Sequence, residues 1–323
     1  MNWIAELPLQ EQDNIDYNDH FYRQRLRALQ AVDELVDGLF ERLEKYDLLD
    51  NTYIFYSTDN GYTIGQHRRQ PGKESGFEED INIPLIIRGP GVAEGRVSSL
   101  VTTHTDLAPT FLSLVGGSLD HKLDGTPIPV HDLPLVAAAE SGKWHEHVNI
   151  EYWGLAVFEG QYGGHDVHWN NTYKGLRVIG KGYNLYYSVW CNDEHQLYDL
   201  EQDPYQVDNL LASSRKDQNT TPARKLLGVP LTKVVSRLDS LLFVLKSCKG
   251  DVCRKPWEAL HPDGGVETLQ DALDKEYDHF YEQEQVRIKY NRCEQGYIID
   301  AEGPQFEVDG LVYRHGVKWS EWV

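Results

Sequence analysis

The sequence predicts an α/β protein, in which a mixed or parallel sheet with flanking helices is followed by a smaller antiparallel sheet with a long helix. Apolar side chains recur at steps of three and four over residues 26–43, a spacing typical of an amphipathic helix. An apolar and aromatic run follows at residues 53–57, and a helix followed closely by a strand is a unit of a parallel α/β sheet. Beyond about residue 165, short strand-like runs alternate with turn residues, which indicates an antiparallel meander.

The first elements can be justified in chain order. The acidic stretch that starts at Asp16 marks a helix N-terminus, because carboxylates complement the helix dipole there. Residues 53–57 and residues 85–87 are predicted as inner strands. Because the first of these runs is apolar or aromatic up to Ser57 rather than alternating, we expect it to be buried on both faces.

The next helix should be capped by Thr105 or Asp106 and end at Gly116, and residues 148–152 should form a further strand. In the second half, strands are predicted at three short runs, followed by a long amphipathic helix over about residues 222–245. The three runs are residues 173–178, 184–190 and 196–199. We expect residues 288–323 to wrap the outside, and a division into residues 1–165 and residues 166–323.

Composition narrows the classes of function. Forty per cent of the 323 residues are apolar, which is enough to build a core, and the formal net charge is -20. Such an acidic chain repels phosphate backbones and anionic membranes, so we expect no nucleic acid and no membrane as partners. No apolar run approaches the ~20 residues that span a bilayer, and the sequence after Met1 lacks the features of a signal peptide.

The four cysteines allow three pairings. Cys248 and Cys253 flank a short span that a disulfide can close, so this local pair is the one we favour. The alternative, free thiols in a cytosolic protein, stays open at this point.

Ligand-type side chains gather after the predicted strand at residues 53–57. Asp59 and Asn60 leave that strand together, and both offer the oxygen atoms that hard divalent cations prefer. Open α/β sheets bind ligands at this edge, although Asp-Asn-Gly is also an ordinary turn. Lys73 lies on the same loop and could bind an anion, while His67 could act as a general acid or pack as a structural histidine. We expect residues 77–80 to shape the loop.

Three motifs in order carry a family resemblance. Thr58-Asp59-Asn60-Gly61 with its loop is followed by Asp106-Leu107-Ala108-Pro109-Thr110 and by Leu197-Tyr198-Asp199-Leu200-Glu201-Gln202-Asp203-Pro204. The sequence resembles the sulfatase family of the alkaline phosphatase-like superfamily, and most of all fungal arylsulfatases. The resemblance implies a partial alkaline phosphatase-like sheet and hydrolysis of the sulfate ester of a small molecule or glycan. It also implies Asp59 and Asn60 as ligands of a calcium ion, and Lys73 as the residue that holds a sulfate oxygen.

The sequence departs from the family in one important respect. Sulfatases carry a Cys or Ser, followed by Pro and Arg at fixed spacing, that matures to the nucleophile formylglycine, and none of the four cysteines has that context. The family's first pair of metal-binding aspartates is also missing. We therefore expect a C-terminal portion, inactive alone, in which residues 1–165 are part of the catalytic core and a missing N-terminal portion would carry the nucleophile. The full-length family is secreted or enters the secretory pathway.

Two other functions remain open. One is a phosphoesterase of the same superfamily, which would build a two-zinc site. The other is a non-catalytic fragment that binds a partner. The second alternative predicts exposed apolar surface along the helix that contains Tyr17 and along the strand at residues 53–57, because an uncovered sheet edge invites association.

Overall fold

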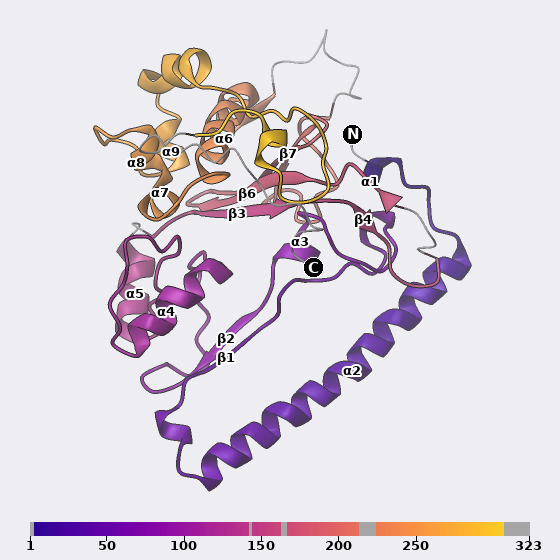
Figure 1. Cartoon of the computed structure of the whole chain (residues 1–323), viewed down its shortest axis with the longest axis vertical. Helices are drawn as coiled ribbons and strands as arrows, with labels where there is room; N and C mark the ends of the chain where they lie inside the picture. Colours follow the sequence, from indigo (N-terminus) through magenta and orange to yellow (C-terminus); the bar gives the residue numbers. More distant parts are fainter. Residues whose placement is uncertain (1–2, 142–143, 163–166, 213–223, 307–323) are drawn as a thin grey trace. The chain divides into compact units, whose positions relative to one another are not determined.

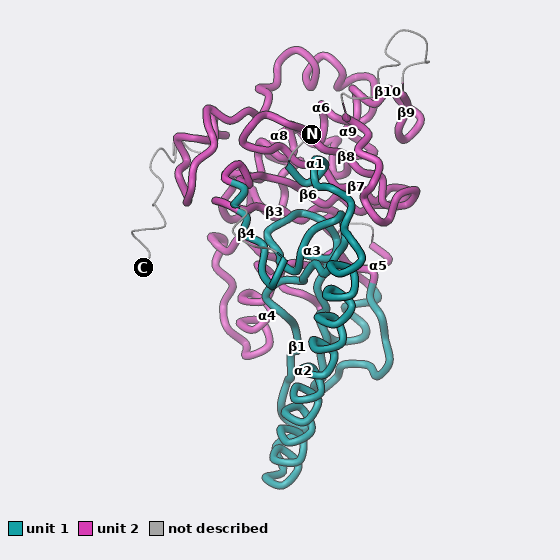
Figure 2. The backbone as a smooth tube through the Cα atoms, turned by 90° about the vertical axis from the view of Figure 1, so that its right-hand side faces the viewer, with its two compact units in different colours: residues 1–98, 130–136, 156–168 teal, residues 99–129, 137–155, 169–323 magenta. Residues whose placement is uncertain are grey.

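The computed structural model describes residues 3–141, 144–162, 167–212 and 224–306 (Figure 1). Its residues form two compact units. Unit 1 comprises residues 1–98, 130–136 and 156–168, and unit 2 comprises residues 99–129, 137–155 and 169–323 (Figure 2). Helices and antiparallel strands occur in both units, which confirms the α/β class. The predicted division at residue 165 stays a prediction.

Unit 1 is built on one long helix and short strands. Its elements are α1 (Trp3–Glu6), α2 (Gln12–Lys45), β1 (Ile54–Ser57), α3 (Glu78–Ile81), β2 (Leu85–Arg88), β4 (Ala156–Val157) and β5 (Val167–His168). The predicted first helix is present as α2 and begins four residues before Asp16, at Gln12. Phe21 of α2 stacks on Tyr62 at 5.9 Å, and Arg88 lies 5.8 Å from the Phe40 ring, so contacts near both ends hold α2 in the unit.

The pairing of β1 corrects two expectations. β1 pairs antiparallel with β2, with Ile54 opposite Arg88 and Ser57 opposite Leu85, so the parallel unit is not formed by these strands. β1 is also not buried on both faces. The cross-strand partners Tyr56 and Ile86 are 37% and 60% exposed, because among the described residues β1 and β2 bond only to each other.

Unit 2 is built on a four-stranded antiparallel sheet in the order β3-β6-β7-β8. Its strands are β3 (His147–Tyr152), β6 (Tyr173–Gly180), β7 (Tyr183–Trp190) and β8 (His195–Asp199), with a hairpin of β9 (Lys225–Leu226) and β10 (Val229–Pro230). Its helices include α4 (Leu107–Leu114), α6 (Leu231–Leu245), α7 (Asp251–Arg254), α8 (Pro256–Leu260) and α9 (Leu269–Ala272). The predicted meander is confirmed, and β3, placed by the sequence in the first region, joins it through β6. α5 (Asp132–Ser141) contributes residues to both units.

The core of unit 2 lies between this sheet and α6. Leu176, Leu185 and Leu197 from three strands are fully buried, as are Leu238 and Leu241 of α6. Side chains from β6, β7 and β8 alternate between faces, so one face of each strand meets the apolar stripe of α6. This packing gives unit 2 a continuous apolar interior.

Two predictions for unit 2 are wrong: the start of the long helix and the position of the C-terminal tail. The long helix begins at Leu231 rather than near residue 222, because residues 225–230 form the β9–β10 hairpin, whose turn places Leu227 and Gly228 at positive φ. Residues 222–223 themselves lie outside the described residues. The tail does not simply wrap the outside, since Ile288 and Tyr290 are buried in unit 2. Residues 307–323 lie outside the described residues.

Both disulfides of the described chain lie in unit 2. The favoured pair Cys248–Cys253 is confirmed, and the second bond joins Cys191, just after β7, to Cys293. The second bond spans 102 residues of sequence and the first spans 5. A disulfide that closes a long loop removes more entropy from the unfolded chain, so Cys191–Cys293 should contribute more to stability.

Candidate active site

The loop that follows β1 is fixed to α3 by backbone hydrogen bonds. The Gly61 N–H donates to the Asp80 carbonyl and the Tyr62 N–H donates to the Glu79 carbonyl, both at 2.8 Å. A Cβ atom on Gly61 would lie 1.9 Å from the Glu79 carbonyl oxygen, so only glycine allows this approach. The end of β1 is therefore held in place where Asp59 and Asn60 leave it.

A second backbone contact brings the two ends of the loop together. Thr63 and Gly72 form an isolated antiparallel bridge, with N–H to carbonyl distances of 2.8 and 3.1 Å. The next residue, Lys73, donates from Nζ to Asn60 Oδ1 at 3.4 Å. The structure thus brings together Lys73 and Asn60, which are thirteen residues apart in sequence.

Local hydrogen bonds orient the two predicted oxygen ligands. Asp59 Oδ1 accepts from the N–H of the next residue, Asn60, at 2.9 Å. Asn60 donates from Nδ2 to the Gly61 carbonyl at 2.6 Å, which leaves Oδ1 to face Lys73. Asp59 and Lys73 are exposed, so this side of the loop presents two oxygen-bearing side chains and an ammonium to solvent.

A buried ion pair that the sequence did not reveal supports the loop. Arg69 is 1% exposed and donates from Nη1 to Asp80 Oδ2 at 3.0 Å, while Ser75 Oγ donates to the same carboxylate oxygen at 2.6 Å. Thr63 also donates to Asp80, through Oγ1 at 2.9 Å. Buried charges need such pairing, so these residues fix the loop's shape. The expectation that residues 77–80 shape the loop is confirmed, whereas Arg69 carried no motif signal.

His67 sits at the rim of the same loop. Its ring stacks on Phe77 with centroids 3.9 Å apart, and its Nε2 lies 3.4 Å from Glu79 Oε1. His67 also has a positive φ of 53°, which the surrounding contacts must compensate. Burial raises the pKa of Glu79, against the opposing effect of Arg69. These contacts position His67, and its role as a general acid stays a prediction.

The loop fits a divalent cation only in part. Asp59 and Asn60 supply hard oxygen donors, but calcium takes about 6–8 oxygens. Among the described residues, no group of three or more His, Cys, Asp or Glu side chains is arranged to hold a metal. The two side chains can therefore contribute to a metal site but cannot complete one.

The second motif, which starts at Asp106, has a structural role. Asp106 is 1% exposed and accepts from the Thr103 and Thr126 N–H groups at 2.9 and 2.7 Å. Thr103 and Asp106 form a capping box around the 3-10 turn at His104–Asp106, and Asp106 is the N-cap residue of α4, as the sequence predicted, although its side chain makes no capping hydrogen bond to α4. The motif anchors the start of α4 inside unit 2.

Comparison with known proteins places the chain in a family. The Sulfatase family profile matches residues 6–117, and the profile described as N-sulphoglucosamine sulphohydrolase, C-terminal, matches residues 69–228. Sulfatase ppz1 of Metarhizium majus is 41% identical over 94% of this chain, and an arylsulfatase of Chlamydomonas reinhardtii is 37% identical over 94% of it. The chain belongs to the sulfatase family, as the motifs predicted.

The chain matches only part of the length of these relatives. The chain spans 62% of the length of the first relative and 46% of the second. A solved structure of BT4656 in complex with its substrate D-glucosamine-2-N,6-O-disulfate has a TM-score of 0.51 and 26% identity to the chain. That match covers 64% of this chain and 39% of the other. Within the described ranges, every helix is too short or too polar to cross a bilayer.

Proposed function

We propose that the loop over residues 58–73 is part of the sulfate-ester site of a sulfatase. Lys73 binds a sulfate oxygen, and Asp59 and Asn60 ligate a divalent cation, calcium by the family resemblance. The observation that carries this proposal is the 3.4 Å contact between Lys73 Nζ and Asn60 Oδ1, which joins the anion-binding and the cation-binding side chains. An ammonium beside a bound cation would offset the negative charge on the sulfate oxygens while the bond from sulfur to the ester oxygen breaks. His67 would serve at the rim as a proton donor.

The substrate class follows from the same proposal. The relative of solved structure is bound to a disulfated glucosamine, and one matching profile is that of an N-sulphoglucosamine sulphohydrolase. We infer that the whole protein acts on a sulfate ester of a glycan or small molecule. Its nucleophile would be a formylglycine supplied from outside this stretch, because all four cysteines here are in disulfides. Two disulfides also favour the secretory pathway, where such bonds form and persist.

Exposed apolar surface on unit 1 supports a further stretch of polypeptide. Of the 34 residues of α2, Asn18 is buried, whereas seven large apolar side chains are exposed by more than a third: Ile15, Tyr22, Leu26, Leu29, Leu35, Val36 and Leu39. Tyr56 and Ile86 add exposed apolar area on the β1–β2 pair. An amphipathic helix normally packs its apolar stripe against another element. We propose that an N-terminal portion of a sulfatase-length polypeptide covers this face.

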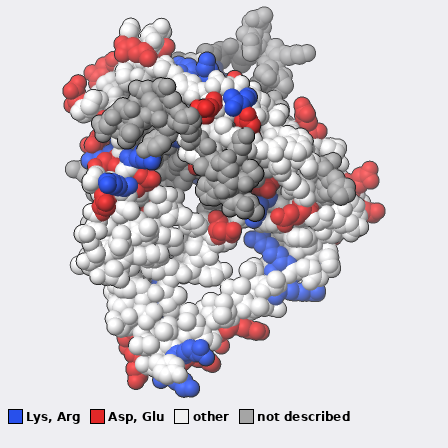
Figure 3. Space-filling view, in the orientation of Figure 1, with Lys and Arg blue, Asp and Glu red and all other residues white. Residues whose placement is uncertain are grey.

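Charged side chains mark the other faces of α2. Basic and acidic side chains both lie along the helix, as Figure 3 shows. The basic residues are Arg23, Arg25, Arg27, Arg42 and Lys45, and the acidic ones include Asp33, Glu34 and Asp37. Charged side chains are stable in water, so it is the exposed apolar positions of α2 that should be covered.

The activity proposal is tested with paired esters. The 323-residue chain should show negligible metal-dependent hydrolysis of p-nitrophenyl sulfate, whereas a longer polypeptide that contains this sequence and the nucleophile motif should hydrolyse it. Activity on p-nitrophenyl phosphate that needs zinc would instead favour the phosphoesterase alternative. Turnover of the sulfate ester by the 323-residue chain itself would overturn the assignment of the nucleophile.

The role of Lys73 has a separate test. Calorimetric titration of phenyl sulfate in the presence of calcium should show weaker binding to Lys73→Met than to the unaltered chain, by about tenfold, because a charge-assisted contact is lost. Lys181→Met is the matched control, since Lys181 is an exposed lysine of unit 2. Equal losses in both variants would show a general effect of net charge and would remove Lys73 from the proposed site.

A further inference from the structure

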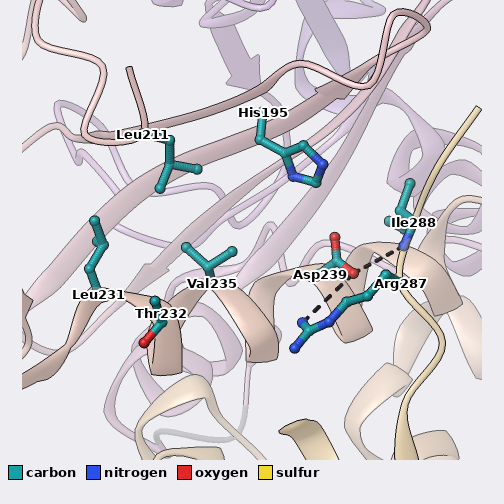
Figure 4. Close-up of a pocket in the computed structure, with 8 residues that line it drawn as sticks. All are labelled: His195, Leu211, Leu231, Thr232, Val235, Asp239, Arg287 and Ile288. Atoms are coloured by element: carbon teal, nitrogen blue, oxygen red, sulfur yellow. Dashed lines mark hydrogen bonds and ion pairs between the residues drawn. The ribbon is translucent and has the colours of Figure 1, made fainter. Parts of the chain in front are cut away.

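Unit 2 contains a cavity that the proposed sulfate site does not use. Its volume is about 380 Å³, and it lies between the edge strand β8, helix α6 and the segment at residues 287–288 (Figure 4). The apolar part of its wall is formed by Leu211, Leu231, Val235 and Ile288. Ligand pockets in proteins typically measure ~300–1,000 Å³, so the cavity is large enough for a small organic molecule.

One end of the cavity is polar and built from a hydrogen-bonded relay. Tyr187 donates its hydroxyl proton to Asp239 Oδ1 at 2.8 Å, and its oxygen lies 2.7 Å from His195 Nδ1. Since the single hydroxyl proton of Tyr187 is used toward Asp239, His195 must donate from Nδ1. The Nε2 atom is then an acceptor, and it has no hydrogen-bond partner among the described residues.

Asp239 is buried with only part of its hydrogen-bonding capacity used. Its side chain is 2% exposed, and besides Tyr187 it accepts from the Ile288 N–H at 3.0 Å. A carboxylate can accept about four hydrogen bonds, and the two that the described residues donate leave room for more. The Arg287 guanidinium lies 4.0 Å away and is 47% exposed, so solvent screens its charge.

The charges around the polar end favour a cation. Asp239 and Asp193 both act on His195 with negative charge, against the single positive charge of Arg287. Burial lowers the pKa of His195, so the ring is neutral and adds no positive charge near pH 7. A ligand that donates hydrogen bonds from a positive group would meet two acceptors, one of them the buried carboxyl group of Asp239.

We propose that this cavity is a binding site for a small primary amine with a compact apolar or aromatic body. The ammonium donates to Asp239 and to His195 Nε2, while the body packs against Leu231, Val235 and Ile288. The geometry suits this orientation because Thr232, Val235 and Asp239 lie on one face of α6, with the acid on the turn beyond the apolar wall (Figure 4). The site lies within unit 2 and does not depend on the sulfatase assignment.

A structural role for the relay alone predicts a different result. If Tyr187 and Asp239 served only to tie the sheet to α6, the cavity would show no preference for the charge of a guest. The probe is therefore 2-phenylethylamine, compared by calorimetry with the neutral 2-phenylethanol and the anionic 3-phenylpropionate on the full chain. We expect the amine to bind at least about tenfold more tightly than the alcohol, because a hydrogen bond to a charged group contributes more than a neutral one. The anion should not bind measurably.

Substitutions distinguish amine binding in the cavity from binding elsewhere on the surface. Val235→Trp should fill the cavity and abolish amine binding, and Thr232→Trp at the exposed start of α6 should do the same with less risk to folding. Val207→Trp is the control, since Val207 is 76% exposed and does not line the cavity. Circular dichroism would verify that each variant is folded.

The charge of the acid is tested separately. Asp239→Asn should lower amine affinity by about tenfold or more while leaving the affinity for the alcohol nearly unchanged. Asp263→Asn, at an exposed turn of unit 2, is the matched control and should change neither. Absence of amine binding to the folded chain, equal binding of the anion, or unchanged binding in a folded Thr232→Trp variant would each overturn the proposal.

Discussion

Helices α2 and α6 are both amphipathic, but the apolar side chains of α6 are buried whereas those of α2 are largely exposed. α6 has 15 residues, of which twelve are buried against the sheet of unit 2 and its neighbours. α2 has 34 residues, of which Asn18 is buried, and its apolar stripe is exposed. An apolar stripe predicts a helix that packs, but it does not say whether the packing partner lies in the same stretch of sequence.

The two units also differ in how their cores are closed. In unit 2, four antiparallel strands, a covering helix and two disulfides surround a continuous apolar interior. In unit 1, the buried centre of the loop is ionic, with Arg69 paired to Asp80, and the β1–β2 pair keeps Tyr56 and Ile86 exposed. Unit 2 should therefore supply most of the cooperative stability, and unit 1 should depend more on what else it contacts.

Removal of the long disulfide should have the largest effect and should act on unit 2 alone. Cys191→Ala with Cys293→Ala should lower the free energy of unfolding by about 4 kcal/mol, as expected for a closed loop near 100 residues. Cys248→Ala with Cys253→Ala is the comparison, and it should cost about 2–3 kcal/mol less because its loop spans 5 residues. Urea unfolding followed by tryptophan fluorescence measures both, and equal losses would contradict the loop-length argument.

A truncation in the core of unit 2 should cause the next largest loss of unfolding free energy. Leu241 is fully buried on α6, so Leu241→Ala should destabilise the chain by about 2–5 kcal/mol through lost burial and a residual cavity. Tryptophan fluorescence is suited to this measurement because seven of the eight tryptophans lie outside the residue ranges of unit 1. A loss below about 1 kcal/mol would show that the helix is not packed on the sheet as described.

Periodicity predicted the elements of unit 2 better than their limits. The short strand-like runs of β6, β7 and β8, separated by turn residues, are a local property of the sequence, so all three strands were placed correctly. The start of α6 was missed because the Leu227-Gly228 turn and Pro230 end a hairpin inside a run of apolar residues that also suits a helix. The apolar composition of β1 predicted that the strand is buried. Burial depends on which elements pack against a strand, and composition does not reveal these elements.

The two units also differ in their buried carboxyl groups, and this difference should make stability depend on pH. Asp80 in unit 1 is paired with Arg69, whereas Glu146 in unit 2 accepts from neutral donors, Trp257 Nε1 at 3.0 Å and the Leu269 N–H at 2.7 Å. Burial is the main cause that raises the pKa of Glu146 to about 7. The folded chain then holds this proton more tightly than the unfolded chain does, so the contribution of Glu146 is complete below pH ~4.5 and is lost as pH rises toward 7.

The variant Glu146→Gln isolates that effect, because an amide mimics the protonated acid. The stability of Glu146→Gln relative to the unaltered chain should rise between pH ~4.5 and 7, by an amount on the order of 3 kcal/mol, and level off above. The comparison with the unaltered chain matters because burial lowers the pKa of His145 and His147 to about 4, which gives the opposite trend over part of this range. A difference that does not vary with pH would mean that Glu146 is ionised in the folded chain.

Of the candidate site, only the residues that belong to a recognisable sequence motif could be predicted. Asp59, Asn60 and Lys73 belong to one loop, and the bridge between Thr63 and Gly72 explains why Lys73 approaches Asn60 despite their separation. Arg69 lies on the same loop, but an arginine in a polar stretch is usually solvated, and its burial against Asp80 emerges only from the folded loop. The cavity beside Asp239 likewise joins a strand, a helix and a distant segment, which no local pattern records.

The smallest expected effect decides whether α2 is truly uncovered. Leu29 is 42% exposed, so Leu29→Ala should change the free energy of unfolding by no more than about 0.5 kcal/mol, although the same substitution at Leu241 costs several times more. Light scattering and binding of a hydrophobic dye should be measured on the same samples, because an exposed stripe of this length promotes association and Leu29→Glu should reduce both. A loss at Leu29 as large as that at Leu241, in a monodisperse monomer, would show that residues of this chain already cover α2, and the need for a further stretch of polypeptide would disappear.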